Sequence, residues 1–143
     1  MSSTTALATG TDCSSVTDPQ FLLDTNVCIY VLADAESAPA RRLADCRPGS
    51  AIVSAISYAE VMMGLGRVGA DAVRQARALF ELIPIVPFDE KAALAYSTLS
   101  FRRGSYDRLI GAHALALGLT LVTSNRRDFD DIPDLAIEDW GRA

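Results

Sequence analysis

The chain alternates between short runs of consecutive apolar residues and longer stretches in which apolar residues recur every three or four positions. The short runs are typical of buried strands, and the longer period is typical of helices that pack on one face. The pattern predicts strands over residues 21–24, 51–54, 84–87, 119–123 and 135–137, and helices over 27–32, 39–46, 56–66, 70–83, 89–101 and 106–117.

Proline and glycine define several of these boundaries. Pro84 and Pro87 bracket the third strand and place it near a sheet edge, because proline lacks the N–H that a central strand donates. Gly118 ends the last long helix, since glycine adopts the left-handed conformation that closes a helix.

Strands that alternate with helices predict an α/β fold in which a parallel sheet is covered on both faces. Residues 21–143 suit one such domain with a single core, because half of the chain is hydrophobic. Residues 1–20 are rich in Ser and Thr and show no period, so we expect a flexible N-terminal extension there.

Composition argues against several classes of function. No segment approaches the roughly 20 consecutive apolar residues of a membrane-spanning helix, and the chain does not begin like an export signal, so we expect a cytoplasmic protein. Cys13, Cys28 and Cys46 match no zinc or redox spacing, and we interpret them as small apolar residues. His113 is the only histidine, which disfavours zinc chemistry and a Ser/His/Asp triad, and we interpret it as a packed helix residue.

Acidic residues follow the predicted strands. Asp24 comes directly after the first strand, Glu60 lies on the helix after the second, and Asp107 enters the helix before the fourth. Because the carboxyl ends of parallel strands meet at one edge, these carboxylates should converge on one crevice. Oxygen donors of this kind suit Mg²⁺ or Mn²⁺, and without a cation they would raise each other's pKa. Thr123, Asn125 and Asp128 follow the fourth strand as further polar candidates.

Each acid also has a structural explanation. Asp24 is able to cap the helix that follows it, and Asp107 in a first helical turn favours the macrodipole. Glu60 stands three residues after Ser57, as in a capping box. The helical period begins before Ser57, however, which makes Ser54 the cap and places Glu60 inside the helix.

The net charge of −5 argues against binding nucleic acid through bulk positive charge. Five arginines nonetheless lie close in sequence to the acids and are candidates for holding phosphates of RNA: Arg102, Arg103, Arg108, Arg126 and Arg127. An ordinary solvated face explains them equally well.

Residues 64–69 match the G-x-G-x-x-G pattern of dinucleotide-binding proteins. That motif follows a strand, whereas residues 57–63 contain Ala, Glu and Met with a helical period. Dinucleotide binding is therefore not expected.

Four segments, taken in order, resemble the PIN domain and in particular the VapC-type toxins of type II toxin–antitoxin pairs: residues 21–27, 56–65, 106–114 and 121–129. The likeness extends from Phe21 to about Trp140. It implies a single PIN-like α/β/α sandwich with a central, mostly parallel five-stranded sheet. It also implies Mg²⁺- or Mn²⁺-dependent cleavage of single-stranded or looped RNA.

The resemblance assigns Asp24, Glu60 and Asp107 to the first three family acids, which are the expected metal ligands. Asn125 stands where a fourth acid is common, which lowers the negative charge of the site, and Asp128 is the candidate that contributes instead. The resemblance also assigns supporting roles to three residues near Asp24, namely Thr25, Asn26 and Thr123.

As a hypothesis, a metal-activated water attacks the RNA phosphate in line and leaves a 5′-phosphate and a 3′-hydroxyl. Proteins of the resembled type form dimers and are silenced by a small antitoxin whose helix lies in an apolar groove. Residues 56–65 and 73–83 are the segments expected to supply that groove.

Two other functions are weighed against this one. A PIN module that binds RNA or a protein partner without cutting is compatible with Asn125, although the three retained acids disfavour it. A phosphotransfer or receiver-type domain also places acids at strand ends, but the sole lysine, Lys91, lies in a predicted helix away from them.

Overall fold

Residues 18–100 and 106–141, which the computed structural model describes, form a five-stranded sheet in the order β4-β3-β2-β5-β6. The strands are β2 (Phe21–Leu23), β3 (Ala51–Ser54), β4 (Ile85–Val86), β5 (Thr120–Val122) and β6 (Ile137–Glu138). Every neighbouring pair is parallel, with Leu22 opposite Ile52 on one side and Leu121 on the other. The predicted parallel α/β fold is confirmed, and β4 lies at a sheet edge as its prolines indicated.

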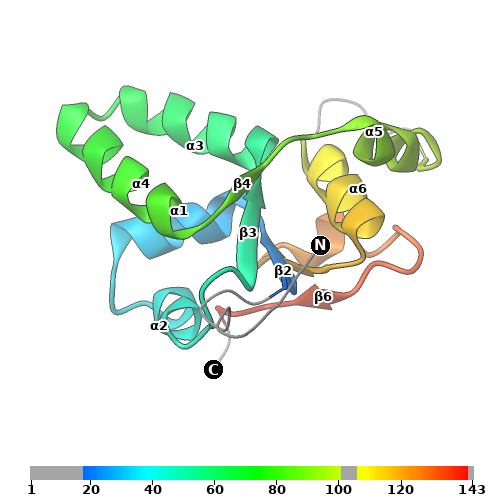
Figure 1. Cartoon of the computed structure of the whole chain (residues 1–143), viewed down its shortest axis with the longest axis horizontal. Helices are drawn as coiled ribbons and strands as arrows, with labels where there is room; N and C mark the ends of the chain where they lie inside the picture. The colour runs from blue at the N-terminus through cyan, green and yellow to red at the C-terminus, as the bar shows by residue number, and fades with distance from the viewer. Residues whose placement is uncertain (1–17, 101–105, 142–143) are drawn as a thin grey trace, which may run out of the picture.

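Helices cover both faces of this sheet (Figure 1). They are α1 (Thr25–Ala33), α2 (Ala38–Ala44), α3 (Ala55–Gly66), α4 (Ala70–Leu82), α5 (Glu90–Ser97) and α6 (Asp107–Leu117), with a short 3₁₀ helix η2 (Arg126–Asp128). Leu23 and Val53 pack toward α1, α3 and α4, whereas the alternate residues Leu22 and Ile52 pack toward α6. Strands send successive side chains to opposite faces, so each strand contributes to both layers of the core. Among the described residues, no helix has the length and apolarity to span a membrane.

The start of α3 fixes the position of Glu60. The Ser54 hydroxyl accepts a hydrogen bond of 3.1 Å from the backbone N–H of Ile56, so α3 begins at Ala55. Ser57 therefore lies inside the helix, and the capping-box explanation of Glu60 does not apply.

Two elements differ in extent from the prediction. The last strand pairs over Ile137–Glu138 rather than 135–137, because Leu135 packs against the core beneath α6. The helix predicted over 89–101 is the shorter α5, and the Thr98 side chain bonds back to the Ala95 carbonyl where it ends. Residues 101–105 lie outside the described residues.

The glycine-rich segment over 64–69 is preceded by a helix. Helix α3 runs through Gly66, and Gly69, with φ of 145°, allows the turn into α4. A dinucleotide site needs a strand at this point, so this interpretation is excluded.

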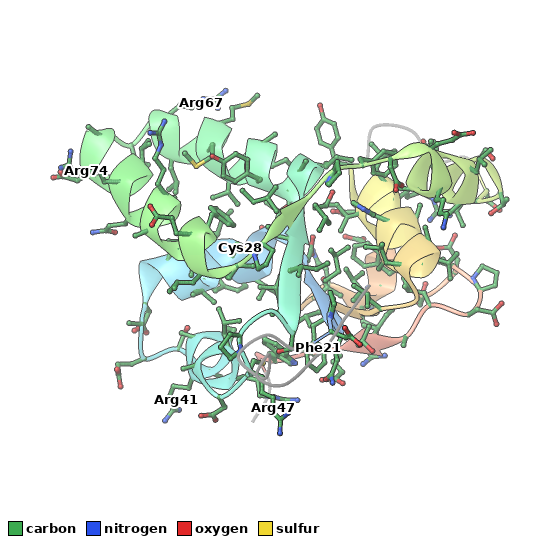
Figure 2. The ribbon with its side chains drawn as sticks, viewed as in Figure 1. Phe21, Cys28, Arg41, Arg47, Arg67 and Arg74 are labelled. Atoms are coloured by element: carbon green, nitrogen blue, oxygen red, sulfur yellow. The ribbon has the colours of Figure 1, made fainter. Side chains whose placement is uncertain are left out.

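The described cysteines behave as packing residues. Cys28 lies on the buried face of α1, and burial raises the pKa of its thiol to about 12. Figure 2 shows Cys28 inside the fold, whereas Arg67 and Arg74 extend outward from α3 and α4. A thiol with so high a pKa is not a reactive nucleophile. Cys13 lies outside the described residues.

Candidate active site

The acidic residues lie at the point where the strand order of the sheet reverses. Strand β2 is central, β3 lies on one side of it and β5 on the other, so the chain crosses over in opposite directions from β2. Asp24 directly follows β2, and Thr123 directly follows β5. This point, beyond the carboxyl ends of the strands, is where α/β sheets form their binding crevices.

Asp24 is buried and held by two hydrogen bonds. Its Oδ1 accepts from the Thr25 backbone N–H at 2.8 Å, which caps α1, and its Oδ2 accepts from the Thr123 hydroxyl at 2.8 Å. Burial raises the pKa of Asp24, while the two hydrogen bonds partly offset that increase. One oxygen thus caps the helix, and the carboxylate as a whole has a fixed orientation toward the site.

Glu60 is connected to Asp24 through a single residue. The Thr25 hydroxyl donates to Glu60 Oε1 at 2.7 Å, while the Thr25 backbone N–H donates to Asp24. Thr25 therefore joins α1 to α3 and holds the two carboxylates in a fixed relation. Asn26, the other residue expected to orient Asp24, is exposed on α1.

Asp107, the first residue of α6, belongs to the same electrostatic group. Its pKa is raised to about 6, first by burial, then by the negative charge of Asp24, and further by a hydrogen bond and charge from Asp128 and by the charge of Glu60. A hydrogen bond between two carboxyl groups requires a proton on one of them. Asp128, which sequence alone offered as a substitute for a fourth acid, thus lies with the other three.

Asn125 enters this network through its backbone. Its N–H donates to the Thr123 hydroxyl at 3.0 Å, and that hydroxyl in turn donates to Asp24. The Asn125 side chain is exposed. The loop after β5 therefore orients Thr123, which orients Asp24.

The arginines expected to hold RNA phosphates differ in their surroundings. Arg126 and Arg127 are exposed after β5, and Arg126 Nη2 donates to the Ile137 carbonyl at 3.3 Å. Arg102 and Arg103 lie outside the described residues.

Arg108 is a correction to the sequence analysis. Its side chain is only 2% exposed, and its Nη1 donates to Asp131 Oδ1 at 3.0 Å. The phosphate-binding role expected for it is wrong, because helical geometry turns the residue after Asp107 toward the protein interior.

Arg108 and Gly111 hold the segment after η2 against α6. A Cβ atom on Gly111 would meet Ile132 Cδ1 at 2.7 Å and Phe129 Cδ1 at 3.1 Å. The absence of a side chain lets this segment approach the helix, and the Arg108–Asp131 contact ties it there. Asp128, the last residue of η2, directly precedes this segment, so both contacts bring it toward Asp107 at the start of α6. The sequence signal for this role was a glycine within an alanine-rich helix.

His113 is a packed helix residue, as its sequence context indicated. It is buried on α6, its Nδ1 lies 2.9 Å from the Ser54 hydroxyl, and its ring meets Phe88 edge-on. Burial lowers the pKa of His113. The contact links the end of β3 to α6.

The donor chemistry of this site fits a divalent cation. The negative charges of Glu60 and Asp128 contribute to the raised pKa values of Asp24 and Asp107. Within residues 18–100 and 106–141, no Arg or Lys forms an ion pair with Asp24 or Glu60. In the same ranges no three Asp, Glu, His or Cys side chains form a ready ligand cage. Mg²⁺ commonly uses one or two carboxylates and keeps several waters, so the group suits such a partly hydrated ion.

Known proteins resemble this chain over most of its length. The PIN domain family matches residues 21–135. Ribonuclease VapC1 of Haemophilus influenzae is 31% identical over 130 residues, which cover 84% of this chain and 97% of the relative. The tRNA(fMet)-specific endonuclease VapC of Salmonella typhimurium is 28% identical over 130 residues, covering 85% and 98%. The solved structure of VapBC-1 from nontypeable Haemophilus influenzae aligns with a TM-score of 0.73 at 28% identity, covering 85% of this chain and 98% of that one.

Proposed function

The chain belongs to the PIN-domain family, and from that premise we propose that it is a Mg²⁺-dependent endoribonuclease and the toxin of a toxin–antitoxin pair. The observation that carries the proposal is the group of four carboxylates near the carboxyl ends of the central strands, where Thr25 joins Asp24 to Glu60 and where the pKa values of Asp24 and Asp107 are raised. Relatives that span nearly the same length are named as ribonucleases and as a tRNA endonuclease. We propose the cytoplasm as its compartment, because cellular RNA and the antitoxin would be met there.

Asp24 and Asp107 are the residues that would bind Mg²⁺, or Mn²⁺, with Glu60 as a further ligand or as the group that positions a water. The ion supplies a water of lowered pKa and neutralises charge on the scissile phosphate. Thr123 and Thr25 hold the acids in place, and Asp128 adds to the raised pKa of Asp107 after burial and the charge of Asp24. Arg126 and Arg127 are exposed at the same edge and would bind flanking phosphates.

The proposal is tested by incubating partner-free protein with labelled, structured RNAs in Mg²⁺ and in excess EDTA. We expect cleavage only with the metal, and we expect fragments that carry 5′-phosphate and 3′-hydroxyl ends. Cyclic phosphate ends, or cutting that survives EDTA, would contradict the mechanism. Saturable RNA binding without cleavage of any substrate would favour the non-catalytic PIN module.

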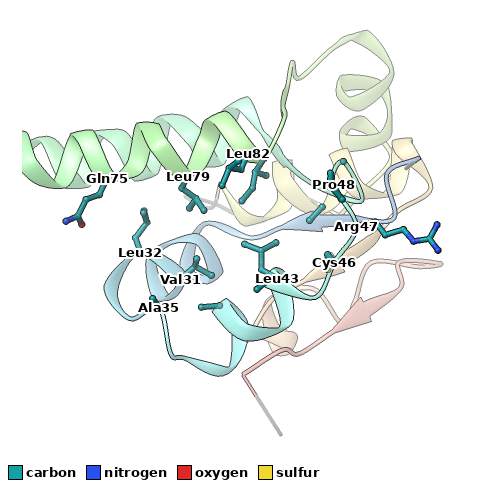
Figure 3. A pocket seen from close by; sticks show the side chains of 15 residues that line it. Val31, Leu32, Ala35, Leu43, Cys46, Arg47, Pro48, Gln75, Leu79 and Leu82 are labelled. Atoms are coloured by element: carbon teal, nitrogen blue, oxygen red, sulfur yellow. The ribbon is translucent and has the colours of Figure 1, made fainter. Parts of the chain in front are cut away.

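An apolar cavity of about 560 Å³ supports the antitoxin partner (Figure 3). It lies between α1, α2 and α4, and Val31, Leu43, Leu79 and Leu82 are among the residues that line it. Exposed apolar grooves of this kind receive the apolar face of a partner helix. Two of the similar solved structures are of VapBC, from Salmonella typhimurium and from nontypeable Haemophilus influenzae, which agrees with a protein partner as the occupant.

The cavity includes only one of the two segments that the sequence analysis expected to form the groove. Residues 73–83 contribute to it through α4, but residues 56–65 do not line it. The reason is that the α3 stripe packs Val61 into the core, so α1 and α2 supply the remaining walls. The homodimer that the resemblance implies stays a prediction.

Leu82→Glu is expected to weaken antitoxin binding by a factor on the order of 30 or more, because a charge would enter an apolar contact. Leu82 is 77% exposed, so the substitution should leave the fold intact. The matched control is Leu94→Glu on α5, at a leucine that is 60% exposed and away from the groove. The dissociation constants for the antitoxin measure the effect, and equal loss in both variants would argue against this groove.

A further inference from the structure

A buried hydrogen bond joins the two helices that carry Glu60 and Asp107. His113 Nδ1, on α6, lies 2.9 Å from the hydroxyl of Ser54, which ends β3 and caps α3. Both side chains are buried. Glu60 lies on α3 and Asp107 begins α6, so the contact ties the helix of one acid to the helix of another.

This contact is at the end of the sheet where the acids lie. Val53 of β3 is paired with Leu23 of β2. Ser54 and Asp24 are the next residues on these neighbouring strands, so Ser54 is beside Asp24 in the sheet register. The position of Ser54 therefore affects both the end of β2 and the start of α3.

Apolar packing and this hydrogen bond hold α3 and α6 together in different ways. Ile56 on α3 packs against the core cluster that contains Ile110 and Ala114 of α6. Apolar packing is non-directional, whereas a hydrogen bond has a preferred length and angle. The His113–Ser54 bond therefore gives the two helices a directional contact that the apolar cluster does not supply.

The direction of this hydrogen bond follows from the other bond that Ser54 makes. The Ser54 hydroxyl already accepts from the Ile56 N–H at 3.1 Å, and among the described residues His113 Nδ1 is the group placed to accept its proton. A histidine ring accepts at Nδ1 only when it is neutral and carries its proton on Nε2. Burial lowers the pKa of His113, although the charge of Asp89 opposes this, so the neutral ring predominates at pH 7.

We propose that His113 is a positioning residue of the acidic site. By accepting the Ser54 proton at Nδ1, it fixes α6 against the start of α3 and thereby sets the position of Asp107 relative to Glu60. Each acid lies on the same helix as the contact, or on the helix that the contact caps, within roughly two turns. The inference rests on the proposed function, because it assumes that these acids hold a cation.

The tautomer of His113 tests the direction of the bond. His113 is the only histidine of the chain, so in protein without a histidine tag its imidazole signals are unambiguous. In heteronuclear NMR near neutral pH we expect the proton on Nε2 and an unprotonated Nδ1. A proton on Nδ1 would overturn the proposal, because Nδ1 could not then accept from Ser54.

Two substitutions of His113 separate its hydrogen bond from its volume. Asparagine carries its amide oxygen at the position of Nδ1 and can still accept from Ser54, whereas leucine fills the space without an acceptor. Binding of Mn²⁺ alone, followed by its EPR signal without RNA, measures the effect on the cation site. We expect His113→Leu to weaken Mn²⁺ binding by about tenfold, and His113→Asn by less than about threefold.

Phe88→Leu and Ser54→Ala are the matched controls. Phe88→Leu changes the edge-on packing of the His113 ring but keeps the hydrogen bond, so Mn²⁺ binding should stay near that of wild type. Ser54→Ala removes the other partner and should weaken Mn²⁺ binding about as much as His113→Leu. Because both substitutions remove one bond, the double variant should lose no more than either alone.

Thermal unfolding in EDTA shows which variants are folded, and Ser54→Ala and the tautomer decide the matter if His113→Leu is not. Equal losses of Mn²⁺ binding in His113→Leu, His113→Asn and Phe88→Leu would show that His113 only packs, and would overturn the proposal. Unchanged binding in His113→Leu and Ser54→Ala would do the same. Wild type that binds Mn²⁺ but cuts no RNA would contradict the proposed function alone, since the binding comparison still decides the role of His113.

Discussion

Asp24→Asn is expected to reduce RNA cleavage by more than the roughly 10- to 100-fold that accompanies the loss of an outer contact of a metal site. The substitution removes a charge that the proposed ion needs and changes little else. Asparagine offers an oxygen to the Thr25 N–H and an amino group to the Thr123 hydroxyl, which can accept it. Single-turnover cleavage rates with Mg²⁺, compared with wild type, measure the loss.

A companion variant distinguishes the proposed metal ligand from the residue that orients it. Thr123→Val removes the hydroxyl that donates to Asp24 Oδ2 and keeps the shape of the side chain. We expect this variant to lose about 10- to 100-fold in cleavage rate, because the carboxylate remains but is less well oriented. Wild-type rates for Asp24→Asn, with metal dependence retained, would remove Asp24 from the site.

Asp107→Asn is expected to abolish cleavage to a similar degree and to stabilise the metal-free protein near neutral pH. The folded protein raises the pKa of Asp107 from 3.8 to about 6. Between these values the unfolded chain releases the proton while the folded chain keeps it, so stability falls as pH rises through this window. Above pH 6 the ionised carboxylate is at its most unfavourable. Asparagine is not ionised and still donates to Asp128.

The expected gain is on the order of 1 kcal/mol at pH 8, because partial exposure screens most of the energy implied by the pKa change. At this chain length such a gain raises Tm by roughly 2–6 °C. The difference between the variant and wild type should vanish near pH 4. Thermal unfolding in EDTA at both pH values measures it.

Added Mg²⁺ provides the control for the same experiment. Binding to the folded state should raise the Tm of wild type and should raise that of Asp107→Asn much less. A variant less stable than wild type at pH 8, or one with the same response to Mg²⁺, would contradict the role assigned to Asp107.

The acids come together through contacts that have no local sequence signature. Asp107 and Asp128 lie on opposite sides of β5 in the chain, and they meet because Gly111 lets residues 129–132 pack on α6. Arg108 reinforces this packing from the interior. Sequence reasoning offered Arg108 as a contact for RNA phosphates because it lies close in sequence to the acids. Charged side chains are as a rule exposed. A partner 23 positions away overrode that rule.

The sequence by itself determined the elements and the strand ends at which chemistry is possible. Apolar runs and helical periods are local, and parallel connectivity places every strand end at one edge, so Asp24, Glu60 and Asp107 could be singled out in advance. Only the tertiary structure decided which side chains face one another. Burial of Arg108, the inclusion of Asp128, the linking role of Thr25, and the groove between α1, α2 and α4 depend on packing between distant segments. Such packing follows from the shapes of many side chains together, which no short sequence pattern records.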